Sequence, residues 1–238
     1  MNEAEFTFKT PAVTQEIKNI RLDGYKNIFE YESNPFPDPS HPNLWGTETL
    51  CGDWDGKLLI ILKDFGPTGY VEKRGDGRPG YSHRINSATN ANLVRFISEA
   101  GHELDAKGEK NTSCGILYAS ACFLLKIGDG VQTRISADAL TASWPAIEFT
   151  IQRMNHLSDI VLCGRHAISS FRKNAIDKPL QFGDTAHLGN RRVHATCHTN
   201  PQAVISRGDA KRLGKPGRDV TQEEWNRIIR ACFGDSHA

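Results

Sequence analysis

Four short segments rich in apolar residues, each bounded by turn-forming residues, constrain the fold of this chain more than any other feature. They are residues 57–62 (KLLIIL), 115–125 (GILYASACFLL), 159–163 (DIVLC) and 192–196 (RVHAT). Such short runs are typical of strands that are buried on both faces, as in a parallel sheet. Segments with helical periodicity lie between and after them, at 90–100, 143–157, 165–174 and 221–233. The alternation predicts an α/β fold, a three-layer α/β/α domain around a central, mostly parallel four-stranded sheet.

The domain organisation follows from the position of the first strand. We expect residues 57–238 to form the α/β domain, and residues 1–56 to form an extension that packs on it. Within the extension, residues 14–28 have a helical pattern, and a long loop rich in proline and glycine follows them. Near the other end, Thr221 and Glu224 have the spacing of a capping box, so the last helix is predicted to begin at Thr221.

The charge balance excludes one class of protein. The chain has 238 residues and carries 29 Lys and Arg against 28 Asp and Glu, so its net charge is +1 and bulk charge cannot bind it to nucleic acid. A contact with DNA must come from a local patch, and residues 188–218 hold seven basic residues and one acidic residue. No apolar run approaches the roughly 18 residues of a membrane span, so we expect no membrane partner.

The cysteines indicate a reducing compartment. All six are widely spaced, and no C-x-x-C motif occurs. The first residues lack the charged and then apolar pattern of a secretion signal. We therefore expect a cytoplasmic monomer with reduced thiols. Cys163 with His166, and Cys197 with His198, have spacings that zinc ligands can use, but each pair follows an apolar strand, so we interpret these cysteines as buried and expect no metal.

The ends of the predicted strands are where a site is expected. In open α/β sheets, ligands bind at the carboxyl ends of the strands. In this chain those ends carry Asp64, the segment 118–122, Gly164 and His198. We expect these residues to converge.

Four motifs at these strand ends resemble the uracil-DNA glycosylase superfamily, in the right order over roughly residues 57–207. LLIILKDFGP is similar to the first motif of that superfamily, which reads G-Q-D-P-Y or G-E-x-P-G. GDGRPG followed by NANLVRFISEAG resembles its glycine-containing loop and helix, and IEFTIQRMNHLSDIVLCGRHAISSF resembles its helix, strand, glycine and second helix. VHATCHTNP resembles the last motif, a strand that ends in T-x-H-P-S. The ordered set indicates a divergent member.

This resemblance implies a DNA repair enzyme, a glycosylase that hydrolyses the N-glycosidic bond of uracil or another deaminated base in single- or double-stranded DNA. The base is flipped out of the stack, the sugar develops positive charge, and the base leaves as an anion. Asp64 matches the carboxylate that orients the water. His198 matches the residue that stabilises the leaving base, as a neutral or charged imidazole, and His194 is the alternative. The paired cysteines that hold an iron–sulfur cluster in one branch are missing, so no cofactor is expected.

Other residues are assigned to the base pocket. Phe65, Gly66, Tyr81 and Ser120 would surround the flipped base. An aromatic ring stacks on a base, a glycine lets the backbone approach it, and a hydroxyl hydrogen-bonds its edge.

The basic segment after His198 is assigned to DNA. Asn200, Arg207, Lys211 and Arg212 would contact the backbone, and Val204 or Ile205 would fill the space that the flipped nucleotide leaves.

The base pocket also departs from the family pattern, which leaves two alternatives open. The chain reads YASA at 118–121, where the family has an asparagine that reads the uracil edge, and Gly80 replaces a stacking phenylalanine. A catalytically weak or inactive nucleic-acid-binding module on the same fold is one alternative. A small-molecule nucleoside hydrolase is the other, because the strand ends of any α/β domain can bind a small ligand.

Overall fold

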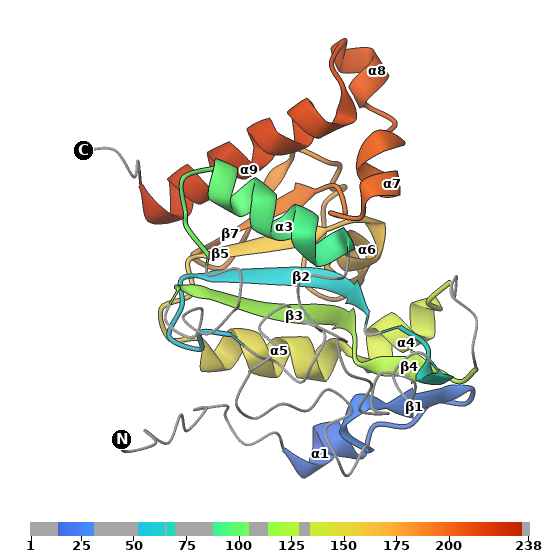
Figure 1. Ribbon diagram of the computed structural model, residues 1–238. Coiled ribbons are helices and arrows are strands. Elements are labelled where there is room, and N and C mark those ends of the chain that lie inside the picture. Colours follow the sequence, from blue (N-terminus) through green and yellow to red (C-terminus); the bar gives the residue numbers. More distant parts are fainter. Residues whose placement is uncertain are drawn as a thin grey trace, which may run out of the picture.

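Five strands form the central sheet of the computed structural model, which describes residues 14–30, 52–64, 66–69, 88–104, 114–128 and 134–234. In order across the sheet they are β3 (Ile116–Cys122), β2 (Leu58–Asp64), β5 (Asp159–Cys163), β7 (Arg191–Thr196) and β6 (Thr185–Leu188). The first four, which Figure 1 labels, are parallel to one another. Strand β6 is antiparallel to β7. The predicted α/β class is confirmed, and the four predicted strands are the parallel ones.

The fifth strand, β6, has no apolar run to indicate it. Thr185 and His187 are exposed, and only Ala186 between them is buried. An antiparallel strand at the edge of a sheet needs only one buried face, so polar and apolar residues alternate along it and a short one resembles a polar loop. Its register comes from pairing with β7, in which Thr185 lies opposite His194.

Helices cover both faces of the sheet (Figure 1). They are α3 (Ala88–Glu99), α4 (Ala137–Ala142), α5 (Trp144–Arg153), α6 (Arg165–Asn174) and α9 (Gly217–Phe233). Leu59 and Ile61 of β2 belong to one buried cluster, with residues of α4, α5 and α6. Leu58 and Ile60 belong to the second, with residues of α3 and α9, because successive side chains of a strand point to opposite faces. This two-sided burial explains the continuous apolar run in β2.

The N-terminal extension is not the predicted helix over 14–28. Helix α1 spans only Gln15–Lys18, and β1 (Tyr25–Asn27) pairs antiparallel with β4 (Leu124–Lys126). The predicted strand over 115–125 divides at Phe123 into β3 and β4, and β4 supplies the partner for β1. The short pair depends on a partner far away in the chain, which a local pattern cannot reveal. Residues 1–13 and 31–51 lie outside the described residues.

The last helix begins earlier than predicted. Helix α9 follows Pro216 and starts at Gly217, so Thr221 lies inside it, with its hydroxyl donating to the carbonyl oxygen of Gly217 over 2.7 Å. The predicted capping box is wrong, because the carboxylate of Glu224 binds the guanidinium of Arg207 instead. No helix in the described segments, α9 included, combines the length and apolar character that crossing a membrane requires.

Candidate active site

The carboxyl ends of the parallel strands bring together the two residues predicted for catalysis. Asp64 ends β2 and lies opposite Cys122, the last residue of β3. Strand β5 ends at Cys163, opposite Thr196 at the end of β7, and His198 follows two residues later. Only β5 separates β2 from β7 in the sheet, so Asp64 and His198 follow strands that are about 10 Å apart at the same edge.

Asp64 presents a carboxylate at this edge with an ammonium group beside it. Lys63 Nζ lies 3.4 Å from Asp64 Oδ2, and the side chains of Lys63 and Asp64 are 29% and 15% exposed. The carboxylate is largely shielded but retains a surface, which is what a group that orients a water molecule requires.

His198 is held in one tautomer by its own loop. The backbone N–H of Asn200 donates a hydrogen bond to Nδ1 of His198 over 3.1 Å. Because the amide donates, Nδ1 carries the lone pair, and the proton of the neutral imidazole is on Nε2. Burial, with smaller contributions from Lys63 and His166, lowers the pKa of His198 to about 4. At neutral pH the ring is therefore neutral and has an Nε2–H to donate.

His166 is a residue of this edge that the sequence analysis did not assign to catalysis. It lies in the first turn of α6, directly after β5. Burial lowers its pKa, Lys63 and Arg134 lower it further, and Asp64 opposes them. Since His198 also responds to Lys63 and His166, these residues act on one another electrostatically. We call Lys63, Asp64, His166 and His198 the strand-end group. The turn from strand through glycine to helix was the signal that could have located His166.

The loop after β2 is described in part. Gly66 begins a segment that is tied to the turn after β4, where the N–H of Gly128 donates to Thr68 Oγ1 over 3.0 Å. Phe65 and Tyr81, which were predicted to stack on the base, lie outside the described residues.

Two residues that were predicted near the base lie in the interior of the sheet. Ser120 is fully buried, two residues before the end of β3 and in register with Leu62, so it has no surface through which to reach a base. His194, the alternative to His198, is 4% exposed, and its Nε2 donates to Oδ1 of Asp159 over 2.7 Å. Strand periodicity could not show how completely the neighbouring elements cover these positions.

Arg207 is not available as the predicted DNA contact. It is 4% exposed, and its guanidinium donates two hydrogen bonds to Asp209, at 2.6 and 2.8 Å, and two to Glu224. Burial alone would lower the pKa of Arg207, but the two carboxylates raise it above its ordinary value. A basic run in a sequence does not show which of its members turn inward.

Helix α7 (Pro201–Ile205) follows His198 and decides between the two predicted wedge residues. Val204 is 4% exposed and belongs to the core, whereas Ile205 is 75% exposed. Asn200 is exposed, but its Oδ1 accepts a hydrogen bond from the N–H of Gln202 and thereby caps α7. Ile205 is the residue of this pair that can meet DNA.

The predicted phosphate contacts with exposed side chains are on α8 (Ala210–Leu213), which lies near the amino end of α9 (Figure 1). Lys211 and Arg212 are both exposed there. Lys215, the next basic residue, pairs with Glu223 over 2.5 Å. The usable positive charge of this region is therefore smaller than its sequence indicates.

The cysteines near the strand-end group are poorly suited to hold a metal. Burial raises the pKa of Cys197 to about 11 and raises that of Cys163 as well, so both are thiols at neutral pH. Zinc is bound by thiolates. Across the described ranges, no three His, Cys, Asp or Glu side chains are grouped so as to hold a metal ion.

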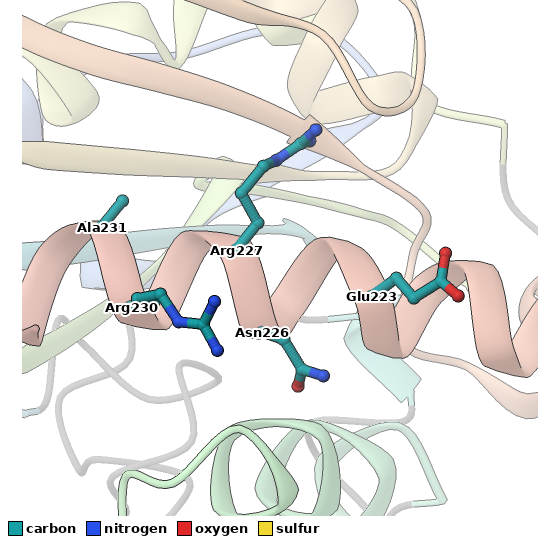
Figure 2. A pocket seen from close by; sticks show the side chains of 5 residues that line it. All are labelled: Glu223, Asn226, Arg227, Arg230 and Ala231. Carbon is teal, nitrogen blue, oxygen red and sulfur yellow. The ribbon is translucent and has the colours of Figure 1, made fainter. Parts of the chain in front are cut away.

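A hollow along α9 is a separate feature of the surface. Figure 2 shows the five residues that line it, all on this helix: Glu223, Asn226, Arg227, Arg230 and Ala231. Several of these side chains already bind neighbours: Arg227 donates to the carbonyl oxygen of Gly183 over 2.8 Å, Glu223 accepts from Lys215, and Asn226 accepts from Gln222 over 2.8 Å. The hollow contains no member of the strand-end group, so we do not assign the site to it.

Comparison with known proteins finds no family model and no curated protein that matches this chain.

Proposed function

We propose that the protein is a DNA base-excision glycosylase that hydrolyses the N-glycosidic bond of uracil or another deaminated base. The observation that carries the proposal is the pair Asp64 and His198 at one edge of the sheet, where Lys63 lies 3.4 Å from Asp64 and acts electrostatically on His198. A carboxylate and a neutral imidazole with a free Nε2–H are the two groups that this reaction needs.

In the proposed reaction each group acts on a different part of the substrate. Asp64 orients a water molecule toward C1′ of the sugar and stabilises the positive charge that develops there. The water oxygen bonds to C1′ as the bond from C1′ to the base nitrogen breaks, and the base leaves with the bonding electrons. Nε2–H of His198 donates to the oxygen of the base on which this negative charge collects. The water proton passes to Asp64 and then to solvent.

The surface beyond His198 supports DNA as the substrate. Lys211 and Arg212 would neutralise phosphates, and Ile205 would occupy the gap left by the flipped nucleotide. These three residues follow His198 in the sequence, so a DNA strand bound at the site would continue onto α7 and α8.

A nucleic-acid-binding module without turnover is the second candidate. The burial of Ser120 favours it, because this removes the residue that was expected to read the base. Ile205, Lys211 and Arg212 would still hold DNA. A nucleoside hydrolase is the third candidate. The salt dependence of binding distinguishes it from the other two, because DNA binding through phosphates weakens with salt, whereas binding of a neutral nucleoside does not.

The deciding experiment is a base-release assay on DNA that contains uracil, hypoxanthine or xanthine, single-stranded and double-stranded. Asp64→Asn should lower the rate by about 10²–10⁴-fold, since it removes the group that activates water. Asp55→Asn is the matched control, because Asp55 is exposed at the opposite end of β2. Salt-sensitive binding with no base released would favour the binding module, and salt-insensitive turnover of free nucleosides would favour the hydrolase.

A further inference from the structure

One carboxylate, that of Glu224, binds both ends of the segment that carries His198. At one end, the hydroxyl of Thr196 donates to Oε2 of Glu224 over 2.6 Å. At the other end, Arg207 donates to both carboxylate oxygens, with Nη1 2.8 Å from Oε2 and Nη2 2.5 Å from Oε1. Residues 197–206 lie between these two contacts. We call Thr196, Arg207 and Glu224 the carboxylate clamp.

The clamp is closed to solvent. Thr196 is fully buried, and Arg207 and Glu224 are 4% and 7% exposed. The hydroxyl of Thr221 accepts from Nη1 of Arg207 over 3.3 Å, and Asp209 takes the remaining side of the guanidinium. A buried ion pair contributes little net stability, but removing one partner leaves an uncompensated charge, so the arrangement is held as a unit.

Backbone contacts hold the same segment against two helices. A Cβ at Gly217 of α9 would overlap the carbonyl oxygen of Val204, so α9 and α7 approach more closely there than a larger residue allows. Toward α3, the hydroxyl of Thr199 donates to the carbonyl oxygen of Thr89 over 3.1 Å, and Asn92 donates to the carbonyl oxygen of Thr199 over 2.9 Å. The segment is thus attached at its ends by the clamp and, at Thr199, by α3.

We infer that Glu224 is a positioning residue of the site: by binding Thr196 and Arg207 together, it fixes residues 197–206 so that His198 stays within the strand-end group. This inference rests on the proposed function. Glu224 is not proposed to contact substrate. Lys211 and Arg212, which are proposed to bind phosphate, lie outside the clamped segment, and of the proposed DNA contacts only Ile205 lies inside it. Loss of the clamp should therefore lower the rate of base release and leave DNA affinity nearly unchanged.

The test compares two matched pairs of variants. Thr196→Val keeps the shape of the side chain and removes the hydroxyl, whereas Thr196→Ser keeps the hydroxyl. Glu224→Gln removes the clamp charge, whereas Glu223→Gln removes a charge one position away that pairs only at the surface. Each variant is measured for single-turnover base release, for its Kd on uracil-containing DNA, and for the titration of the His198 imidazole by NMR.

Thr196→Val should release base roughly 10–100-fold more slowly, because small misplacements of a catalytic group carry such costs. Its Kd on single-stranded DNA, which needs no wedge at Ile205, should stay within about twofold, since its phosphate contacts are intact. The midpoint of His198 should move up from about 4 toward 6.5 as the ring becomes hydrated, while Thr196→Ser and Glu223→Gln behave as the unmodified protein. Glu224→Gln should show the larger effect.

The inference is overturned if the members of each pair have equal rates and equal His198 titrations. It is also overturned if the rate falls only in proportion to lost thermal stability while the His198 midpoint stays at about 4. If the unmodified protein releases no base from any DNA, the proposed function fails, and the titration still decides whether the clamp positions His198.

Discussion

Gly164 and His198 lie so close together that position 164 has no room for a side chain. A Cβ at Gly164 would lie 2.9 Å from the Cβ of His198, and the φ of Gly164 is +92°, a conformation that other residues rarely adopt. The contact joins the turn between β5 and α6 to the loop after β7. It explains why His198 lies near the first turn of α6, where His166 is.

Gly164→Ala should displace His198 and destabilise the protein by about 1–3 kcal/mol, through backbone strain and the contact with His198. Base release should fall with it. Gly189→Ala is the matched control, since its φ is +61° but nothing lies within 4 Å of its Cβ position. Urea unfolding measures the stabilities. Equal losses of stability and activity in the two variants would show that the contact with His198 has no consequence.

The neutral state of His198 predicts a specific tautomer and midpoint. Long-range ¹H–¹⁵N NMR spectra at pH 7 should show the proton on Nε2, and the ring should titrate near pH 4. Because this pKa lies below the ordinary value of 6.5, the unfolded chain takes up the proton first. His198 therefore contributes stability that is present above pH 6.5 and is lost as the pH falls toward about 4. A midpoint near 6.5 would contradict this account, and His198→Gln should remove the signal.

Asp159, at the opposite end of the sheet, should make the stability of the protein sensitive to acid. Burial alone would raise its pKa, but hydrogen bonds from His194, Arg192 and Ser158 hold it well below its usual range. The stability that this gives is present above the usual pKa near 4 and is lost as the pH falls below it. Asp159→Asn should cost about 1–3 kcal/mol at pH 7, because it removes the charged acceptor that buried His194 and half-exposed Arg192 share.

Urea unfolding between pH 3 and pH 7 checks the prediction for Asp159. The exposed Asp177 provides the control, and Asp177→Asn should change stability by less than about 0.5 kcal/mol. A loss of stability below pH 4 that is the same in Asp159→Asn as in the unmodified protein would assign the acid sensitivity to other groups.

If Ile205 acts as a wedge, its removal should affect base release from double-stranded DNA more than from single-stranded DNA. Ile205→Ala should leave stability within about 0.5 kcal/mol, because the side chain is 75% exposed. It should slow base release from double-stranded DNA roughly tenfold, and less from single-stranded DNA, which has no stacked partner strand to support. Ile127→Ala, at an isoleucine that is 61% exposed, is the control. An equal loss on both forms of DNA would rule out a wedge.

The main strands and helices could be predicted from the sequence, because a strand that is buried on both faces of a sheet appears as a continuous run of apolar residues. Strand β2 is a continuous apolar run, and α6 has the predicted bounds. The prediction that the strands are parallel also placed Asp64 and His198 at the same edge of the sheet, because the carboxyl ends of parallel strands lie at one edge. These inferences use only residues that are close together in the chain.

The direction of individual polar side chains depends on partners far away in the chain. Thr196 and Glu224 are 28 positions apart and form a buried hydrogen bond, whereas the sequence around Glu224 suggested a capping box. The same carboxylate binds Arg207 in the interior. Nothing near Ser120 in the sequence shows that it is fully covered.

By itself, then, the sequence determined the class of fold, the parallel strands and the edge at which a site must lie, because hydrophobic periodicity is a local property. Only the tertiary structure decided that His198 carries its proton on Nε2, that Ile205 and not Val204 is exposed, and that Arg207 is bound inside. Each of these depends on the backbone amides, carboxylates and helices that folding brings next to a side chain.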